Sequence, residues 1–532
     1  MNGCRPLRSL IPALFLCLLP TLAGAQFTGI YTFTQQAEGC CANQPGMLAQ
    51  GTDGNLYGTL PQGGTGNAGA WLQYNMSGYP MLPNFGNTST GFSNSNSGFT
   101  LGIDGNLYGG VSNVDSLDHG AIMRLAPASP GLSPTGPPTL VYPFPGGTTG
   151  SIPNATFPVA PPIQGTDLNL YGVTDDGNYT GHVYQVLLNT STGVGTSGWN
   201  YLLPSQSLGP LLLGSDGNFY GTYVYGSFDD TTGLPNPGGE GGIFQITPAG
   251  VFGWHHNLTG GADGGNPMGG LIQGADGYLY GTASGGGATS TSKGVIFKIA
   301  LNGSWYSVVH SFEPGDGQEP HGGLVQGSDG YLYGATTSAG PALKIRGLTS
   351  KTVGTLFKVT TSNTNYTVLI PFFGTGYGDV GPGTDPESTP TLHTNGRIYG
   401  LTHTGGESSN GAQPGNPGAS NDAGEFYSYD AGLSPFISIV GQRSAHVGDR
   451  VGIIGQGFSN PIGGAIGVTF GGVAVPWQKA NVTIWSDHYM TVTVPTGAKT
   501  GPVTVQETTG SYSTLYNFTV TIKCGVLCIP LH

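Results

Sequence analysis

The chain has 532 residues, more than one ordinary domain holds, so we expect two or more units or one large closed repeat. Charged residues make up 8% of the sequence, against roughly 25% in a typical soluble domain, and the formal net charge of −13 comes from few acidic side chains. The sequence carries no basic stripe, which argues against nucleic acid and anionic membrane surfaces as partners.

The N-terminus has the pattern of a targeting segment. Arg5 and Arg8 precede an apolar run from Leu10 to Leu22, and Ala23-Gly24-Ala25 follows as a cleavage site. Residues 1–25 are therefore predicted to be a signal peptide, with the mature chain beginning at Gln26. No later run approaches the ~18 consecutive apolar residues of a membrane span, so we expect an exported protein without a transmembrane segment, located in the extracellular space or at the cell surface.

Four cysteines remain after the signal peptide, in a compartment that favours disulfides. Cys524 and Cys528 could bridge locally while Cys40 pairs with Cys41, or the C-terminal tail could be joined to the N-terminal region. Both alternatives stay open, and either one predicts a structural rather than a chemical role.

A short phrase, "GGLIQGADGYLYG" at 269–281, recurs seven times at intervals of about 57 residues. Each copy consists of an apolar run, a turn that usually reads Asp-Gly, and a second apolar run, which is the strongest short signal of a β-hairpin. We expect the aspartate to cap its own turn and the tyrosine to pack between sheets. The core tyrosines are Tyr57, Tyr108, Tyr171, Tyr220, Tyr280, Tyr333 and Tyr399.

A third run opened by glycine follows every copy, as in "GVIFKI" at 294–299, with one polar position predicted to reach water. A fourth run closes most units. Pro143 and Pro371 fall inside fourth runs, which places these runs at a sheet edge because proline cannot donate to a ladder.

The ends of the repeat predict how the sheets close. The seventh unit lacks a fourth run, whereas "GIYTF" at 29–33 stands alone before the first copy. We therefore expect residues 26–434 to form a seven-bladed β-propeller closed by the N-terminal strand, which pairs with 424–429. The predicted fold class is all-β throughout.

From residue 435 another pattern begins, with short strands at the spacing of a β-sandwich. The stretches "VGDRVGIIGQGF" (447–458), "VTFGG" (468–472) and "GAKTGPVTV" (497–505) resemble the IPT/TIG family of immunoglobulin-like domains. The resemblance covers 435–520 and implies a spacer or interaction module without catalytic residues. Residues 521–532 are left as a tail that contains Cys524 and Cys528.

The repeats themselves resemble the bacterial GloVer-type tandem repeats through "GLIQGADGYLYGTASGGG…GVIFKI" and its relatives, over roughly 29–430. They are more distantly similar to sensor-propeller and streptogramin-lyase repeats. The GloVer resemblance implies an exported bacterial protein of undefined function.

Candidate ligand-binding residues lie in the loops between fourth and first runs, "TGGADGGNP" (259–267), "EPGDGQEPH" (313–321) and "GYGDVGPGTDPE" (376–387). Such loops gather on one face of a propeller. The candidate residues are Asp263, Asp316, Glu319, His321 and Asp385, and the same loops also carry Asp379 and Glu387.

These acidic loops have three alternative interpretations. Turn chemistry explains Asp-Gly and proline without any ligand, carboxylates with carbonyls suit Ca²⁺ or sugars, and a carboxylate pair suits glycoside hydrolysis or a lyase. The sequence contains no G-x-S-x-G, H-E-x-x-H, C-x-x-C or P-loop, so no catalytic or metal-ligating residue is assigned.

We therefore expect a monomeric propeller scaffold that binds an extracellular glycan or surface protein. It needs no cofactor, with Ca²⁺ as an option. The alternative is a secreted carbohydrate-active hydrolase or lyase that uses the acidic loops.

Overall fold

The computed structural model is all-β, with no helix in the described residues and hence none long and apolar enough to cross a membrane. The predicted signal peptide and Cys40, Cys41, Cys524 and Cys528 lie outside the described residues. The structure describes residues 27–34, 48–60, 69–76, 80–81, 97–112, 120–127, 138–144, 157–175, 181–189, 191–205, 209–229, 231–232, 234–236, 238–341, 343–345, 348–350, 352–373, 383–403, 422–458, 467–476, 481–506 and 510–522.

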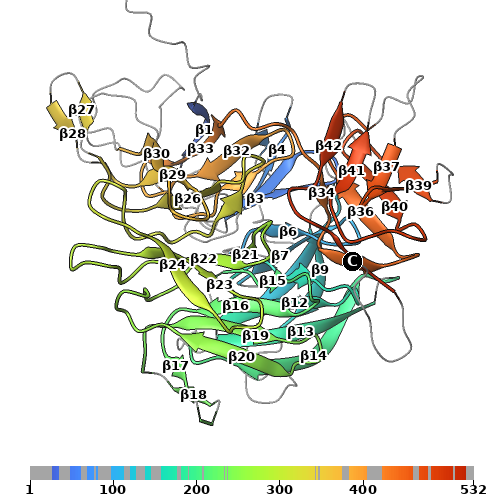
Figure 1. Ribbon diagram of the computed structural model, residues 1–532, viewed down its shortest axis with the longest axis horizontal. Coiled ribbons are helices and arrows are strands. Elements are labelled where there is room, and N and C mark those ends of the chain that lie inside the picture. The colour runs from blue at the N-terminus through green and yellow to red at the C-terminus, as the bar shows by residue number, and fades with distance from the viewer. Residues whose placement is uncertain are drawn as a thin grey trace, which may run out of the picture.

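Each copy of the phrase lies in its own antiparallel sheet, numbered here as repeat sheets 1 to 7 in chain order (Figure 1). Sheet 1 contains β2 (Ala49–Gln50), β3 (Leu56–Leu60), β4 (Ala70–Tyr74) and β5 (Pro80–Met81). Sheet 2 contains β6 (Phe99–Leu101), β7 (Leu107–Val111), β8 (Ala121–Leu125) and β9 (Thr139–Pro143). Sheet 3 contains β10 (Phe157–Pro158), β11 (Ile163–Gln164), β12 (Leu170–Asp175), β13 (Gly181–Asn189) and β14 (Val194–Leu202).

The remaining repeat sheets follow the same order of strands. Sheet 4 contains β15 (Leu212–Leu213), β16 (Phe219–Tyr223), β19 (Gly242–Ile246) and β20 (Phe252–Asn257). Sheet 5 contains β21 (Ile272–Gln273), β22 (Leu279–Ala283), β23 (Val295–Ile299) and β24 (Tyr306–Ser311). Sheet 6 contains β25 (Val325–Gln326), β26 (Leu332–Thr336), β29 (Thr355–Val359) and β30 (Tyr366–Pro371). Sheet 7 contains β31 (Thr391–Leu392), β32 (Arg397–Leu401), β33 (Asp422–Asp430) and β1 (Phe27–Thr34).

Two short ribbons lie in loops between second and third strands. They are β17 (Ser227–Phe228) with β18 (Pro235–Asn236), and β27 (Leu343–Ile345) with β28 (Leu348–Ser350). Pro143 and Pro371 both lie on the outermost strand of their sheets, as predicted.

In six of the seven copies the turn of the phrase is capped by its own aspartate, and in the seventh Asn395 takes this place and accepts the Arg397 N–H at 2.9 Å. In sheet 1, Asp53 accepts the Asn55 N–H at 3.1 Å, and Tyr57 donates its hydroxyl to Asp53 at 2.5 Å. The tyrosine rings are buried, so the predicted structural role of the phrase is confirmed. The same bond joins Tyr108 to Asp104, Tyr171 to Asp167, Tyr220 to Asp216, Tyr280 to Asp276 and Tyr333 to Asp329.

The third copy departs from the Asp-Gly pattern. Gly54 and Gly277 occupy the left-handed region with φ of 81° and 87°, and Leu168 stands at the equivalent place with φ of 67°. A non-glycine residue in this region costs roughly 1–2 kcal/mol. The fold therefore imposes the turn even where the sequence disfavours it.

The polar position of the third run was predicted to reach water, and this is wrong for four of the copies. Gln73, Gln185, Gln245 and Ser428 are buried. Gln73 donates to Tyr57 Oη at 3.2 Å and Gln185 to Tyr171 Oη at 2.8 Å. The buried tyrosine hydroxyl thus provides a partner that the glutamine would otherwise find in solvent.

The N-terminal strand completes the last repeat sheet. β1 pairs antiparallel with β33, with Thr28 opposite Ser428 and Gly29 opposite Tyr427. The predicted pairing of residues 29–33 with 424–429 is therefore found. It gives sheet 7 a fourth strand that its own stretch of chain does not supply.

A recurring hydrogen bond joins one repeat sheet to the next. The glutamine of the first run accepts a backbone N–H from the turn of the preceding sheet: Gln164 from Asp104 at 3.1 Å, Gln273 from Ser215 at 3.0 Å, and Gln326 from Ala275 at 2.8 Å. Gln50 of sheet 1 accepts from Thr394 of sheet 7 in the same way, at 3.0 Å. Sheets 7 and 1 are therefore joined by the same kind of hydrogen bond as these pairs of consecutive sheets.

The hydrophobic core is divided among the spaces between neighbouring repeat sheets. One cluster combines Leu48 and Leu56 of sheet 1 with Leu401 and Phe426 of sheet 7. Six further clusters each join two consecutive sheets, from the first to the seventh. Apolar burial, the main stabilising term in folding, therefore links the first sheet to the last as well.

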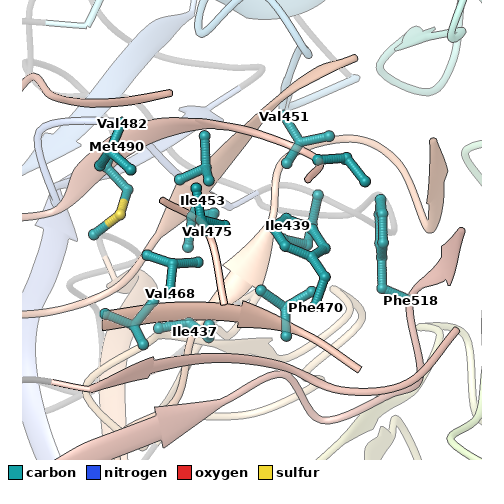
Figure 2. Close-up of a cluster of buried hydrophobic side chains, with 14 of the residues drawn as sticks. Ile437, Ile439, Val451, Ile453, Val468, Phe470, Val475, Val482, Met490 and Phe518 are labelled. Atoms are coloured by element: carbon teal, nitrogen blue, oxygen red, sulfur yellow. The ribbon is translucent and has the colours of Figure 1, made fainter. Parts of the chain in front are cut away.

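Residues 434–522, called the C-terminal unit here, form two four-stranded sheets around a separate core (Figures 1 and 2). One sheet contains β34 (Ser438–Ile439), β36 (Arg450–Ile454), β40 (Tyr489–Thr493) and β39 (Val482–Ile484). The other contains β38 (Val473–Ala474), β37 (Gly467–Phe470), β41 (Val503–Gln506) and β42 (Ser511–Ser513). A parallel pair joins β35 (Ser444–His446) to β43 (Thr519–Thr521).

The C-terminal unit packs against the turns of the repeat sheets. Ser486 donates to the carbonyl of Thr52 at 2.8 Å, and Gln456 donates to Thr394 Oγ1 at 2.7 Å. Each of these turns follows the C-terminal end of a first strand, whereas an acidic loop leads into the N-terminal end of a first strand. The candidate loops therefore belong to the other face of the repeat sheets.

Candidate functional site

Two of the predicted ligand-binding residues, Asp263 and Asp316, serve the turns of their own loops. Asp263 accepts from the backbone N–H of Thr259 at 3.0 Å and also from the Thr259 hydroxyl. Asp316 accepts from the Glu313 N–H at 3.3 Å and lies 3.2 Å from His310 Nε2. Both contacts fit turn chemistry, and the two aspartates are not gathered with the other candidates.

The carbonyls of the same two aspartates join neighbouring sheets. Tyr306 donates its hydroxyl to the Asp263 carbonyl, and Tyr366 donates to the Asp316 carbonyl at 2.7 Å. Each tyrosine lies on the outermost strand of the following repeat sheet. The loops are thereby held in fixed positions above the sheets.

Glu319 and Asp385 occupy one equivalent position in consecutive loops. Both precede a proline and have left-handed backbones, with φ of 56° and 52°. The Asp385 N–H donates to the Val353 carbonyl at 3.1 Å, and the Asp385 carbonyl accepts the backbone N–H of His403 at 3.0 Å. Such strained positions persist only where the surroundings fix them, and they concentrate at functional sites. Glu319 also forms an exposed ion pair with Lys293 at 3.1 Å.

The structure brings a carboxylate and two imidazoles together beside Asp385. Glu387 Oε1 lies 3.9 Å from His321 Nδ1, and Glu387 Oε2 lies 3.6 Å from His403 Nδ1. We call His321, Glu387 and His403 the His–Glu–His cluster. All three side chains are partly exposed, at 31%, 24% and 30%, so a ligand can reach them.

The cluster changes the protonation of its members. The Glu387 carboxylate raises the pKa of His403, although burial of the imidazole acts in the opposite direction. Burial raises the pKa of Asp385, and the neighbouring Glu387 charge adds to this effect, while the two histidines oppose it. An aspartate and a histidine with raised pKa values therefore stand beside Glu387.

The cluster can donate and accept hydrogen bonds at one place, which suits hydroxyl-rich ligands, and its perturbed groups also suit proton transfer. In the described part of the chain, no group of three or more His, Cys, Asp or Glu side chains is arranged to hold a metal ion. The expectation of Ca²⁺ therefore gains no support from these residues. Asp379 lies outside them.

His403 was not among the predicted site residues. It lies four residues after Tyr399 of β32. Ser284 and Thr337 lie at the same distance after Tyr280 of β22 and Tyr333 of β26. Aligning the copies of the repeat shows this change from a small hydroxyl residue to histidine. That substitution, beside a loop already rich in acids, was the available signal.

The Gloeobacter/Verrucomicrobia repeat family model matches residues 158–413, a little under half of the chain. No curated protein matches the sequence. Among solved structures, virginiamycin B lyase from Staphylococcus aureus is similar with a TM-score of 0.40 and 14% identity, over 65% of this chain and 88% of that one.

Two further solved structures are similar at the same low level. A fungal alcohol oxidase of the AA5 family, in complex with copper, has a TM-score of 0.43 and 13% identity over 93% of this chain and 99% of its own. A putative 6-phosphogluconolactonase from Bacteroides fragilis has a TM-score of 0.36 and 16% identity over 61% and 82%. At these scores the likeness assigns no activity to this chain.

Proposed function

We propose that this protein is an exported bacterial scaffold that binds an extracellular glycan or surface protein on the face formed by its acidic loops. In this proposal the repeat sheets form a closed seven-bladed β-propeller, and the C-terminal unit is an immunoglobulin-like IPT/TIG domain that acts as a spacer. The single observation that carries the binding site is the His–Glu–His cluster beside Asp385.

Closure of the ring is supported by two independent kinds of contact. The Gln50–Thr394 bond repeats between sheets 1 and 7 the bond that joins consecutive sheets elsewhere. The pairing of β1 with β33 ties the chain start to the last sheet. A closed ring leaves no open sheet stack at which further chains could add.

Glycan binding is supported by the chemistry of the cluster. Glu387 can accept hydrogen bonds from sugar hydroxyls, while each imidazole can donate or accept depending on its protonation. The loops that carry these residues are fixed by backbone bonds and by the Tyr366 contact. A rigid site loses less conformational entropy on binding, which favours affinity for a polar ligand.

The proposal is tested by measuring binding of the mature chain to a glycan array and to isolated envelope components. Glu387→Gln removes the central charge and is expected to weaken binding about tenfold or more, because a charge-assisted hydrogen bond is lost. Glu240→Gln is the matched control, since Glu240 is an exposed carboxylate in the loop after β18 on the same face, outside the cluster. Absence of binding to every component, or equal losses in both variants, contradicts the proposal.

A second candidate function is a secreted carbohydrate-active hydrolase or lyase. It is favoured by the raised pKa of Asp385 in the loop that also carries Glu387, because general acid–base catalysis uses a carboxyl group whose pKa is raised toward the working pH. Incubation with polysaccharide mixtures should then release oligosaccharides, and Asp385→Asn should abolish release while binding persists. If the wild-type chain releases no product from any mixture that it binds, the scaffold function stands alone.

A further inference from the structure

A cavity of about 370 Å³ lies between the repeat sheets and the C-terminal unit. The first strands of sheets 5, 6 and 7, together with Leu48 of sheet 1 and Pro210 of sheet 4, form one part of its wall, and the C-terminal unit forms the other. Its volume lies within the range of small-molecule sites. The apolar side chains of the wall include Leu48, Leu271, Leu324, Leu392, Phe436 and Leu515.

Arg443 is the one charged residue among the described residues of this wall. Its guanidinium carbon lies 4.1 Å from the centre of the Tyr516 ring, which holds one face of the planar group. The backbone is fixed as well, because the Arg443 carbonyl accepts the Thr519 N–H at 2.9 Å. The guanidinium is therefore positioned before any ligand arrives.

Arg443 forms no ion pair with any described residue. Burial lowers the pKa of Arg443, and the neighbouring Tyr516 opposes this shift. A guanidinium withdrawn from bulk water is stabilised when an anion completes its hydrogen bonds. The described residues of the wall include no carboxylate that could be this anion.

The other polar side chains of the wall already have partners. Gln273 bonds to Ser215 at 3.0 Å, Gln326 bonds to Ala275 at 2.8 Å, and Thr389 accepts from Gly323 at 2.8 Å. These bonds hold the repeat sheets together. The N–H groups of Arg443 thus remain as the donors available to a molecule inside the cavity.

We infer that this cavity is a second binding site, which takes a small organic carboxylate with an apolar body and anchors its carboxylate on Arg443. A planar guanidinium matches a carboxylate with two parallel hydrogen bonds. The single positive charge suits a monoanion, whereas a phosphate dianion would leave one charge uncompensated between apolar walls. The leucine and phenylalanine side chains then cover the rest of the ligand.

The inference goes beyond the proposed function, because the cavity lies on the side of the repeat sheets that faces the C-terminal unit. Failure of carboxylate binding would not count against the proposed site on the loop face, and failure of glycan binding would not count against the cavity as a binding site. The two sites are therefore tested separately.

The experiment measures binding of benzoate and hexanoate to the full mature chain by calorimetry and by the shift in Tm. We expect saturable binding of one molecule per chain, and none for benzyl alcohol or hexan-1-ol, which lack the charge. Arg443→Gln should weaken carboxylate binding about tenfold or more, since a charge-assisted pair is removed. Arg443→Lys, which keeps the charge without the planar fork, should give an intermediate loss.

Arg450→Gln is the matched control, because Arg450 belongs to the same unit but is exposed and bonds to Thr491 at 2.9 Å. It should bind both carboxylates as the wild type does. If Arg443→Gln does not fold, the affinity of Arg443→Lys and the comparison of carboxylates with alcohols still test whether Arg443 binds the carboxylate. Equal affinity in wild type and Arg443→Gln, equal stabilisation by sulfate, or no saturable binding of either carboxylate up to roughly 10 mM overturns the inference.

Discussion

His393 of sheet 7 donates its Nε2–H to the carbonyl of Gly54 in sheet 1, across 2.8 Å and 339 positions of sequence. The tautomer follows from the other ring nitrogen, because His393 Nδ1 accepts the Asn395 N–H at 3.1 Å. The imidazole is buried and neutral. It occupies a place where other copies of the phrase have glycine, and it joins the two ends of the repeat.

This bond predicts a loss of stability in mild acid. Burial lowers the pKa of His393 from 6.5 to about 4, so the unfolded chain binds the proton more tightly than the folded one. The stabilisation is present above the unfolded pKa and is lost as the pH falls from about 6.5 toward 4. Between about pH 7.5 and pH 5, this residue should cost about 2 kcal/mol of unfolding free energy.

His393→Gln removes the titration and isolates this contribution from that of His403, whose raised pKa acts in the opposite sense. Urea unfolding at the two pH values should show a smaller difference for the variant than for the wild type. An unchanged difference would show that His393 is not neutral in the folded state.

Leu168→Gly should stabilise the protein by about 1 kcal/mol, because the leucine has a left-handed backbone with φ of 67°. Gly277→Leu is the mirror experiment. No atom lies within 4 Å of the added Cβ position there, so its cost reports the backbone alone. Unfolding midpoints that move in opposite directions support the assignment; a destabilised Leu168→Gly refutes it.

The tyrosine–aspartate bond should contribute differently in different copies. Tyr57 donates to the buried Asp53 and accepts from the buried Gln73, so Tyr57→Phe leaves two buried groups without this partner. Tyr333 donates to the exposed Asp329, which water can satisfy after Tyr333→Phe. We expect a loss of about 2–3 kcal/mol for the first variant and about 1 kcal/mol for the second, measured by denaturant unfolding. Equal losses would show that burial of the acceptor is irrelevant.

Glu387→Gln should lower the pKa of His403, because the carboxylate is the main cause that raises it. The imidazole proton resonances, followed by NMR over a pH titration, provide the measurement, with Glu240→Gln as the control. A His403 titration that is the same in wild type and Glu387→Gln would place the two side chains apart in solution.

Much of the fold could be predicted because the same pattern of strands and turns recurs in seven copies of the sequence repeat. The Asp-Gly turn, the buried tyrosine and the edge prolines follow from local chemistry, and the lone run at 29–33 indicated the strand that pairs with β33. The buried glutamines of the third strands could not be predicted in this way. Their environment depends on a tyrosine hydroxyl from the neighbouring strand, which periodicity alone does not reveal.

The candidate site could be predicted only in part. Composition identified the acidic loops, but it could not separate Asp316, which caps a turn, from Glu387, which faces two histidines. The Arg443 cavity could not be predicted from the sequence, because it forms where the C-terminal unit meets the repeat sheets. Contacts between distant segments leave no spacing signal in one sequence.

The central claim is that the N-terminal strand completes the last repeat sheet and so closes the ring. The direct measurement is disulfide mapping, by mass spectrometry of the oxidised monomer, of a Thr28→Cys, Ser428→Cys variant. These residues are register partners in β1 and β33, and antiparallel partners lie close enough for a disulfide. We predict an intrachain bridge between positions 28 and 428, and none when Thr28→Cys is combined with Ser444→Cys. A bridge confined to dimers, or no bridge between 28 and 428, would contradict closure of the ring by β1.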